Sequence, residues 1–139
     1  MDNPEGVYLQ AGRRLSRTSE RAFNDLVIES LDESLAMVLG EIAKWAVYEG
    51  IDRKYEIARG QVTKRLDEFT TALERIFGVT ASQTMTRVII KRLYSKLGFT
   101  FVERPDWRFP DYVIEARSRM AMFKDSVQRG SVCERPLRN

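Results

Sequence analysis

The sequence predicts an all-α fold, or a mainly α fold with one short β element near residues 99–109. Two observations favour helices: apolar residues recur every three or four positions in several segments, and glycines follow these segments where a helix would end. The size of the chain fits a single folded domain, because 139 residues with 43% hydrophobic content can bury one core. We expect four or five helices packed compactly around a central αα-hairpin, with a folded domain at 19–127 and flexible tails at 1–18 and 128–139.

The first helical pattern spans residues 19–49, with Ser19 as its N-cap. The segment is interpreted as one long helix or as two helices with a slight break, and Gly50 is expected to end it. Residues 51–60 are polar and mixed, and they are expected to form a connection. Seven residues of this pattern share one arc at helical spacing, and they are predicted to face the core: Leu31, Leu35, Val38, Leu39, Ile42, Trp45 and Ala46.

The central hairpin is predicted from two amphipathic runs that Gly78 separates. The first run covers 61–77, with apolar residues on one face and charged residues on the other. The second begins near Thr80, a suitable N-cap, and continues to Leu97, where Gly98 stops it. Two helices joined by so short a turn form an αα-hairpin.

The region after Gly98 changes character. Residues 99–102 are all aromatic or β-branched, and apolar and polar positions alternate weakly along them, which is typical of a short strand. Pro105 and Pro110 restrict the residues before them, so 104–110 is expected to be a rigid loop that carries Trp107. A final helix is predicted to start near Pro110 or Asp111. Its inner face is expected to hold Val113, Ala116, Met120 and Phe123.

Charge is unevenly distributed along the chain. Residues 29–57 carry seven acidic and three basic side chains, whereas residues 58–97 carry eight basic and three acidic ones. The two segments could face each other inside one fold or meet a partner. The single cysteine allows no intrachain disulfide, and no apolar run is long enough to span a bilayer. We therefore expect a cytoplasmic protein without membrane association.

The composition argues against most catalytic chemistry. The chain has no histidine, which excludes histidine as a general base or as a metal ligand. One cysteine cannot form a thiolate cage, and no glycine pattern matches a dinucleotide or phosphate loop. Carboxylates clustered at Glu29, Asp32 and Glu33 are typical of a solvated helix face. We predict a non-enzymatic protein that needs no cofactor and no metal.

One helix face suggests a binding function. On a helical wheel of residues 80–97, apolar residues fill one arc and basic residues spread over the opposite half, with two more apolar residues set among them. Either a neighbouring helix covers this face, for example the acidic one at 29–49, or it contacts a protein partner or a second copy of the chain. The residues of this predicted partner-binding face are Met85, Arg87, Val88, Lys91, Arg92 and Lys96.

Nucleic acid is the alternative partner for the same face. Basic residues on a helix that follows a tight turn resemble a helix-turn-helix, and a hairpin at 99–109 would supply the wing of a winged helix. Against this, Thr84 and Arg87 stand where apolar packing positions are usual in that motif. The predicted helix is also long for a recognition helix. A small DNA-binding transcriptional regulator is therefore the second interpretation.

Two stretches carry a resemblance to a known family. Residues 73–81 (LERIFGVTA) and 92–99 (RLYSKLGF) are similar to a pattern in uncharacterised output domains of the NitrOD type, found in signalling proteins of ammonia-oxidising archaea. The similarity extends over about residues 31–120. It implies a helical signal-output module of an archaeal regulatory system, acting by contact with protein or nucleic acid. It implies no catalytic residues.

Overall fold

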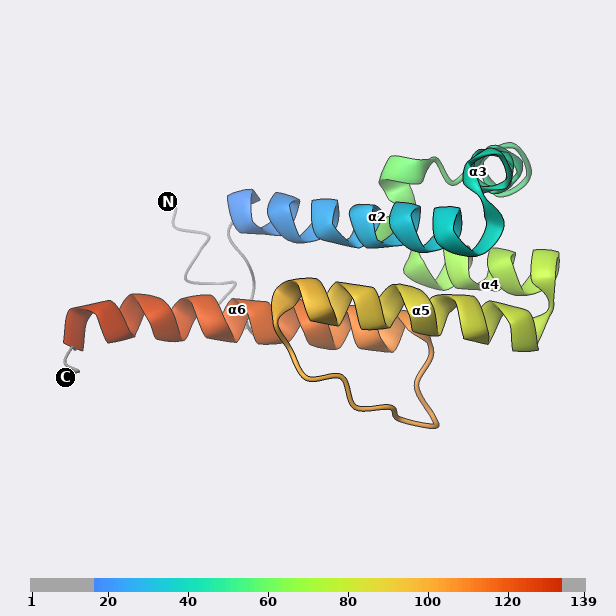
Figure 1. The fold of residues 1–139 in the computed structure, drawn as a ribbon. Coiled ribbons are helices and arrows are strands. Elements are labelled where there is room, and N and C mark those ends of the chain that lie inside the picture. The colour runs from blue at the N-terminus through green and yellow to red at the C-terminus, as the bar shows by residue number, and fades with distance from the viewer. Residues whose placement is uncertain (1–16, 134–139) are drawn as a thin grey trace.

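The computed structural model describes residues 17–133 and the side chains of residues 19–122. Within that range the chain is all-α, as predicted, and contains no strand (Figure 1). Of the expected tails at 1–18 and 128–139, residues 1–16 and 134–139 lie outside the described residues, and residues 17 and 18 already belong to the first helix. The elements are α2 (Arg17–Leu39), α3 (Glu41–Tyr55), the 3-10 helix η1 (Arg59–Lys64), α4 (Leu66–Phe77), α5 (Val79–Leu97) and α6 (Phe109–Cys133).

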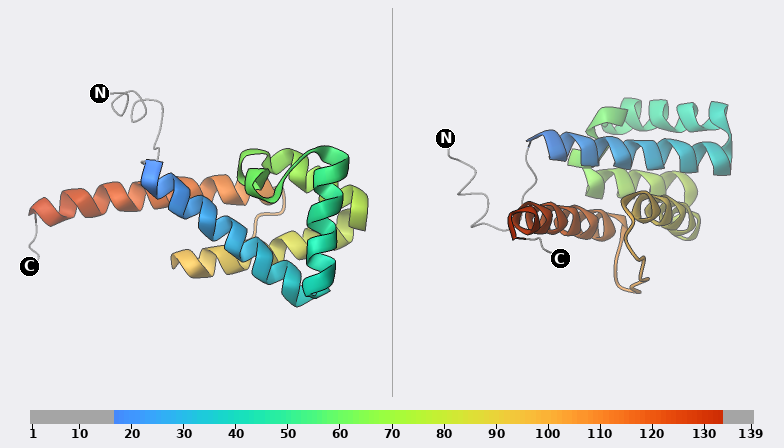
Figure 2. Two further views of the ribbon diagram at one scale, coloured as in Figure 1. Left: turned by 90° about the horizontal axis from the view of Figure 1, so that it is seen from above. Right: turned by 60° about the vertical axis from the view of Figure 1, so that its left-hand side comes forward.

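Helix α5 lies at the centre of the arrangement and packs against α2, α4 and α6. Helices α5 and α6 run side by side in the same direction, and α2 crosses above them (Figures 1 and 2). Helix α3 turns away from α2 and is seen almost end-on in Figure 1. The C-terminal part of α6 extends beyond the other helices.

The core is built from one stripe of each helix. On α2 the stripe recurs every fourth residue, at Phe23, Val27, Leu31 and Leu35, all of which are fully buried. Burial of such side chains is the main stabilising contribution to a domain of this size. Other fully buried large side chains include Ile51, Ile57, Val62, Phe69, Leu73, Ile89, Ile90, Leu93, Tyr94 and Val113.

The central αα-hairpin is confirmed. Gly78 alone separates α4 from α5, and its φ of 88° is a conformation that favours glycine. Gly98 ends α5 as predicted, with a φ of 76° and an N–H that donates to the Ser95 carbonyl. The N–H of Phe99 donates to the Tyr94 carbonyl, which completes a Schellman motif, and the Phe99 and Tyr94 rings lie 6.3 Å apart.

In the α2–α3 region the structure confirms two helices with a break, one of the two alternatives for residues 19–49, and contradicts the expected end at Gly50. The break falls at Gly40, which has a φ of 94°, and Gly50 does not stop the helix. Helix α3 instead continues through Gly50 to Tyr55. It continues because Tyr48 and Ile51 are buried on one side of it, and that burial outweighs the cost of about 1 kcal/mol for glycine in a helix.

The segment between α5 and α6 is an irregular loop, so the strand predicted at 99–102 is wrong. The described residues offer it no second strand to pair with, and its aromatic side chains pack on helices instead. The ring of Phe101 lies 5.7 Å from Tyr94 and 5.5 Å from Tyr112. Trp107 lies 5.1 Å from Tyr112. The Tyr112 hydroxyl accepts from the Arg104 N–H (2.8 Å) and donates to the Arg104 carbonyl (3.0 Å), which fixes the loop.

Helix α6 begins at Phe109, next to the predicted start. Val113 and Ala116 on its inner face are buried as expected, and Met120 is partly buried. The side chain of Phe123 lies outside those described. The helix reaches Cys133, six residues past the predicted boundary at 127, so the expected C-terminal tail is helical from 128 to 133. Among the described residues, no helix combines the length and apolar character needed to cross a membrane.

Candidate interaction surface

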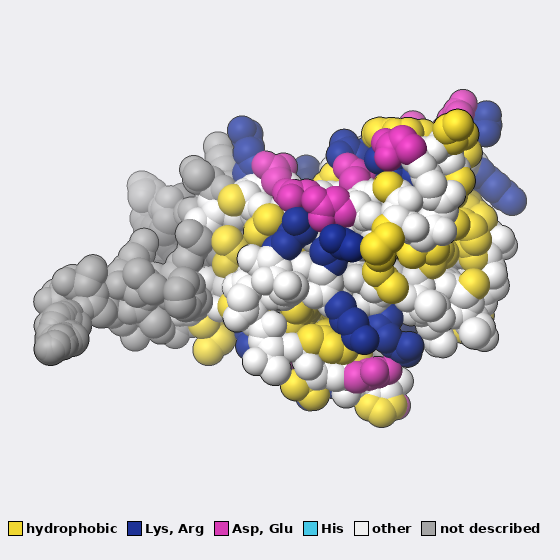
Figure 3. Space-filling view, in the orientation of Figure 1, with side chains coloured by type: hydrophobic (Ala, Val, Ile, Leu, Met, Phe, Trp, Pro, Cys, Tyr) yellow, Lys and Arg dark blue, Asp and Glu magenta, His cyan; other side chains and the backbone are white. Residues whose placement is uncertain are grey.

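The basic end of α5 faces the acidic side of α2. The Lys96 ammonium lies 2.9 Å from a Glu29 carboxylate oxygen and 3.1 Å from one of Glu33. Arg92 donates to the Ser34 hydroxyl at 3.3 Å and lies 3.5 Å from Glu33. A row of acidic side chains above basic ones is visible in Figure 3. Two of the six predicted partner-binding residues thus contact an acidic helix of their own chain.

The ionisation of these groups reflects the same contacts. Hydrogen bonds to Glu29 and Glu33 raise the pKa of Lys96. The hydrogen bond from Lys96, helped by the nearby charge of Arg92, lowers the pKa of Glu33. Each charge therefore stabilises the ionised form of its partner across the α2–α5 contact.

The other four residues of the predicted face are divided between surface and core. Arg87 and Lys91 are exposed, with Arg87 paired to Glu103 at 3.0 Å and the Lys91 ammonium 5.8 Å from the Phe101 ring centre. Val88 is half-buried, and Met85 is only 5% exposed. The placement of Met85 on an accessible face is therefore wrong. Helices cover α5 on three sides, so its buried sector is wider than a single amphipathic arc indicates.

Large apolar side chains are exposed instead at the junction of α2 and α3. We name this surface the elbow patch; it consists of Met37 (61% exposed), Val38 (47%), Ile42 (88%) and Trp45 (48%). Figure 3 shows hydrophobic side chains gathered over the end of α2 and over α3. Three of these residues, Val38, Ile42 and Trp45, were predicted to face the core. For Ile42 and Trp45 the prediction is wrong because Gly40 changes the chain direction, so the arc on α2 does not continue onto α3. Val38 lies in the last turn of α2, outside the buried stripe of that helix.

The indole of Trp45 is held in place although half of it is exposed. Its Nε1–H donates to Glu41 at 3.0 Å, and its ring lies 5.6 Å from that of Tyr48. The Lys44 ammonium lies 4.5 Å from the centre of the indole, and the Arg59 guanidinium 5.8 Å. A fixed, half-exposed indole loses little conformational entropy when another surface covers it.

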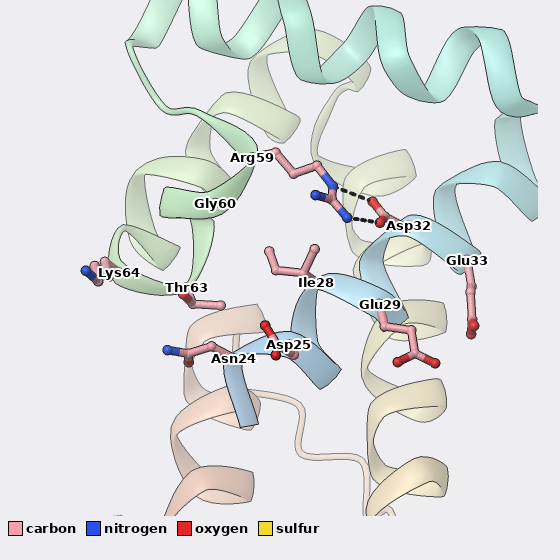
Figure 4. A pocket seen from close by; sticks show the side chains of 10 residues that line it. All are labelled: Asn24, Asp25, Ile28, Glu29, Asp32, Glu33, Arg59, Gly60, Thr63 and Lys64. Carbon is pink, nitrogen blue, oxygen red and sulfur yellow. Dashed lines mark hydrogen bonds and ion pairs between the residues drawn. The ribbon is translucent and has the colours of Figure 1, made fainter. Parts of the chain in front are cut away.

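A polar groove of about 620 Å³ lies beside the elbow, between α2 and η1. Its best-defined contact is Asp32, which accepts two hydrogen bonds from the Arg59 guanidinium and one from the Tyr48 hydroxyl at 2.6 Å. Figure 4 shows Arg59 reaching from η1 to Asp32, while Lys64 points away from α2. The residues that line the groove are Asn24, Asp25, Ile28, Glu29, Asp32, Glu33, Arg59, Gly60, Thr63 and Lys64.

Most carboxylates of this groove already form hydrogen bonds or ion pairs with neighbouring side chains. Burial by itself raises the pKa of Asp32, but hydrogen bonds from Arg59 and Tyr48 and the charge of Arg59 keep it below its ordinary value. Glu29 and Glu33 contact α5. The described side chains contain no cluster of His, Cys, Asp or Glu suited to a metal ion. In the part of the chain described, the groove thus mainly fastens η1 to α2 through Asp32.

Sequence reasoning missed the elbow patch and the Asp32–Arg59 pair. Gly40 was the available signal for the first, since a glycine between Leu39 and Glu41 permits a change of direction that would end the arc. The Asp32–Arg59 pair joins residues 27 positions apart, and no local pattern indicates which of several arginines contacts Asp32.

Comparisons with known proteins give no relative. No protein-family model matches the chain, and neither does any curated protein or solved structure.

Proposed function

We propose that this chain is a non-catalytic protein-interaction module, a signal-output domain of an archaeal regulatory system as the family resemblance implies, and that it binds its partner through the elbow patch. The observation that carries the proposal is the exposure of Met37, Val38, Ile42 and Trp45 around one junction, with Ile42 88% exposed. Water contact with so many large apolar groups is unfavourable, and a partner surface would remove it.

The composition of the patch also fits a binding surface. Tryptophan and methionine are enriched at protein interfaces, and tryptophan is among the residues that contribute most to binding energy. Glu41, which is 66% exposed, lies beside the patch and fixes Trp45. An apolar centre with charged groups at its edge is the usual organisation of an interface.

The α5 face takes a smaller part in this proposal than the sequence predicted. Lys96 and Arg92 are engaged with α2, and Met85 is in the core. Arg87 and Lys91 remain exposed and would attract an acidic partner. Val102, which is 56% exposed, stands in the loop between their contacts Phe101 and Glu103, whereas four large apolar residues are exposed together at the elbow patch.

Site-specific photo-cross-linking tests the proposal. The photoreactive residue p-benzoylphenylalanine is placed at Ile42, at Lys91 or at Ser118, an exposed position on α6, and each protein is irradiated in an extract of its native cells. We expect one defined adduct from position 42, lost when Val38→Asp or Met37→Asp is added. A defined adduct from position 91 alone would assign binding to the α5 face. Equal labelling from all three positions would contradict a specific surface.

DNA binding, the second interpretation, is disfavoured by two observations. The described residues form no wing, and half of the four basic residues of the α5 face pair with α2. Phosphate contacts by four cations would give a slope of about −3 to −4 when the logarithm of affinity is plotted against that of salt concentration. We expect no measurable binding of random duplex DNA at low salt, and a slope near −4 would reinstate the DNA-binding function.

A further inference from the structure

We propose that the chain has a ligand site under the loop 98–108, and that it binds a small organic anion with a flat apolar body. This goes beyond the proposed function and does not depend on it. The site is a cavity of about 290 Å³ between the loop, α4, α5 and the first turn of α6. That volume is close to the lower limit of about 300 Å³ for small-molecule pockets.

The cavity has an apolar wall and a polar floor. Phe101, Trp107, Phe109 and Tyr112 line it from the loop and α6, and Ile90 lines it from α5. The floor adds the buried residues Thr70, Ser82 and Thr86. The Thr70 and Thr86 hydroxyls donate to the Leu66 and Gln83 carbonyls of their own helices, so the donors for an anion are the arginines that line the cavity. Aromatic and aliphatic walls with a few placed polar groups are typical of pockets that bind flat organic molecules.

The loop that covers the cavity is fixed before any ligand arrives. Both polar groups of the Arg104 peptide backbone bond to the Tyr112 hydroxyl, and the Arg104 guanidinium lies 4.6 Å from the Trp107 ring centre. Phe101 and Trp107 both pack on Tyr112. A preformed wall reduces the entropy lost on binding.

The charges around the cavity favour an anion. Three arginines line it, Arg87, Arg104 and Arg108, against two carboxylates, Glu74 and Glu103. Arg87 pairs with Glu103 at 3.0 Å, and Arg108 pairs with Glu74 at 3.3 Å. The third, Arg104, lies 3.5 Å from a carboxylate outside the lining, that of Glu115.

These ion pairs can be exchanged for a ligand carboxylate. Each arginine side chain is 45–47% exposed, and exposed pairs contribute little to stability. A carboxylate can take two parallel hydrogen bonds from one guanidinium, which makes it a strong competitor. A cationic ligand would meet three arginines, and a compact anion such as phosphate would leave the aromatic wall uncovered.

Trp107 provides a direct readout of binding. The chain has two tryptophans, and the variant Trp45→Phe leaves Trp107 as the only one. Benzoate is the probe, benzylamine is its cationic counterpart of similar shape, and inorganic phosphate is the compact anion. We expect benzoate to change Trp107 fluorescence saturably and to shift the backbone amide NMR signals of Ser82 and Thr86 but not of Ile42. Benzylamine and phosphate should bind at least tenfold more weakly.

Matched arginine variants complete the test. Arg87→Gln and Arg108→Gln should each raise the Kd for benzoate about tenfold, because each removes a charge-assisted hydrogen-bond donor. Arg75→Gln, at an exposed position of α4 outside the cavity lining, should leave the Kd unchanged. Far-UV circular dichroism confirms that each variant is folded. The proposal is overturned if benzoate gives no saturable change in either signal, if benzylamine or phosphate binds as tightly, or if all three variants behave alike.

Discussion

The basic face of α5 and the elbow patch differ in where their contacts are made. On α5, Lys96 and Arg92 reach acidic residues of α2 within the same chain. At the elbow, Ile42 and Met37 project from the surface of the described structure, and no buried cluster includes them. A row of basic residues is thus a weak indicator of a binding surface, because a neighbouring helix can neutralise it. Large apolar groups that the fold leaves exposed are a stronger one.

The largest expected difference comes from the same substitution in the two environments. Ile89 on α5 is fully buried and Ile42 is 88% exposed. Ile89→Ala should lower the free energy of unfolding by about 2–5 kcal/mol, because it removes buried methyl groups and leaves a cavity. Ile42→Ala should change it by less than about 0.5 kcal/mol. Urea unfolding followed by circular dichroism measures both, and a large loss for Ile42→Ala would show that the elbow patch is covered within the chain.

A second prediction compares Gly40, at the centre of the patch, with Gly50, beyond it on α3. Gly40 has a φ of 94° and a ψ of 160°, a region that is nearly exclusive to glycine, whereas Gly50 is inside α3. A Cβ atom would meet nothing within 4 Å at either position, so only the backbone conformation differs. Gly40→Ala should destabilise the protein by about 1–3 kcal/mol. Gly50→Ala should stabilise it by about 0.5–1 kcal/mol. Equal effects would contradict a break at Gly40.

The Asp32 cluster should give a smaller effect that depends on pH. Asp32→Asn removes an ion pair with Arg59, and we expect a loss of about 1–2 kcal/mol at pH 7, limited by solvent screening because a fifth of the Asp32 side chain is exposed. The folded pKa lies below the ordinary value of 3.8, so this stabilisation is complete above that pH and is lost as pH falls through the folded pKa.

Thermal unfolding of both proteins between pH 7 and pH 2 checks this prediction. The difference between the wild-type protein and Asp32→Asn should shrink at acid pH. A difference that stays constant across this range would mean that Asp32 contributes through its shape and not through its charge.

The smallest effect is expected at the α2–α5 ion pairs. Lys96→Gln should destabilise the protein slightly, and added salt should reduce the difference from wild type because exposed ion pairs are screened. Lys91→Gln is the matched control on the same helix, since Lys91 lies over Phe101 and forms no ion pair within the described residues. If Lys91→Gln costs as much as Lys96→Gln, the pairing with α2 contributes nothing.

Helix ends could be predicted from the sequence where a glycine and the end of an apolar pattern coincide. At Gly78 and Gly98 the glycine coincides with the end of an apolar pattern, and both helix ends were predicted correctly. At Gly50 they conflict, because Tyr48 and Ile51 continue a buried stripe past the glycine. At Gly50, tertiary packing determined that the helix continues. A single sequence shows the helix propensity of each residue but not how the helices pack.

The candidate surface was harder to predict than the fold. A helical wheel sorts the residues of one helix into two sides, but it contains no neighbouring helices, so it could not show that Met85 is buried or that Arg92 bonds to Ser34 on α2. The attraction between the acidic and basic segments was one of two alternatives left open by the charge pattern, and the structure shows it. The α3 half of the elbow patch, Ile42 and Trp45, required the direction of α3 relative to α2, which changes at Gly40.

The hydrogen bonds of Tyr112 have a mechanical consequence. Tyr112 lies in the first turn of α6, and its hydroxyl is hydrogen-bonded to both the backbone N–H and the carbonyl of Arg104 in the middle of the loop. Any rotation of α6 about its own axis would therefore carry the loop with it. The C-terminal end of α6 extends past the other helices (Figure 1). A protein that bound this end and rotated the helix would therefore also move Arg104.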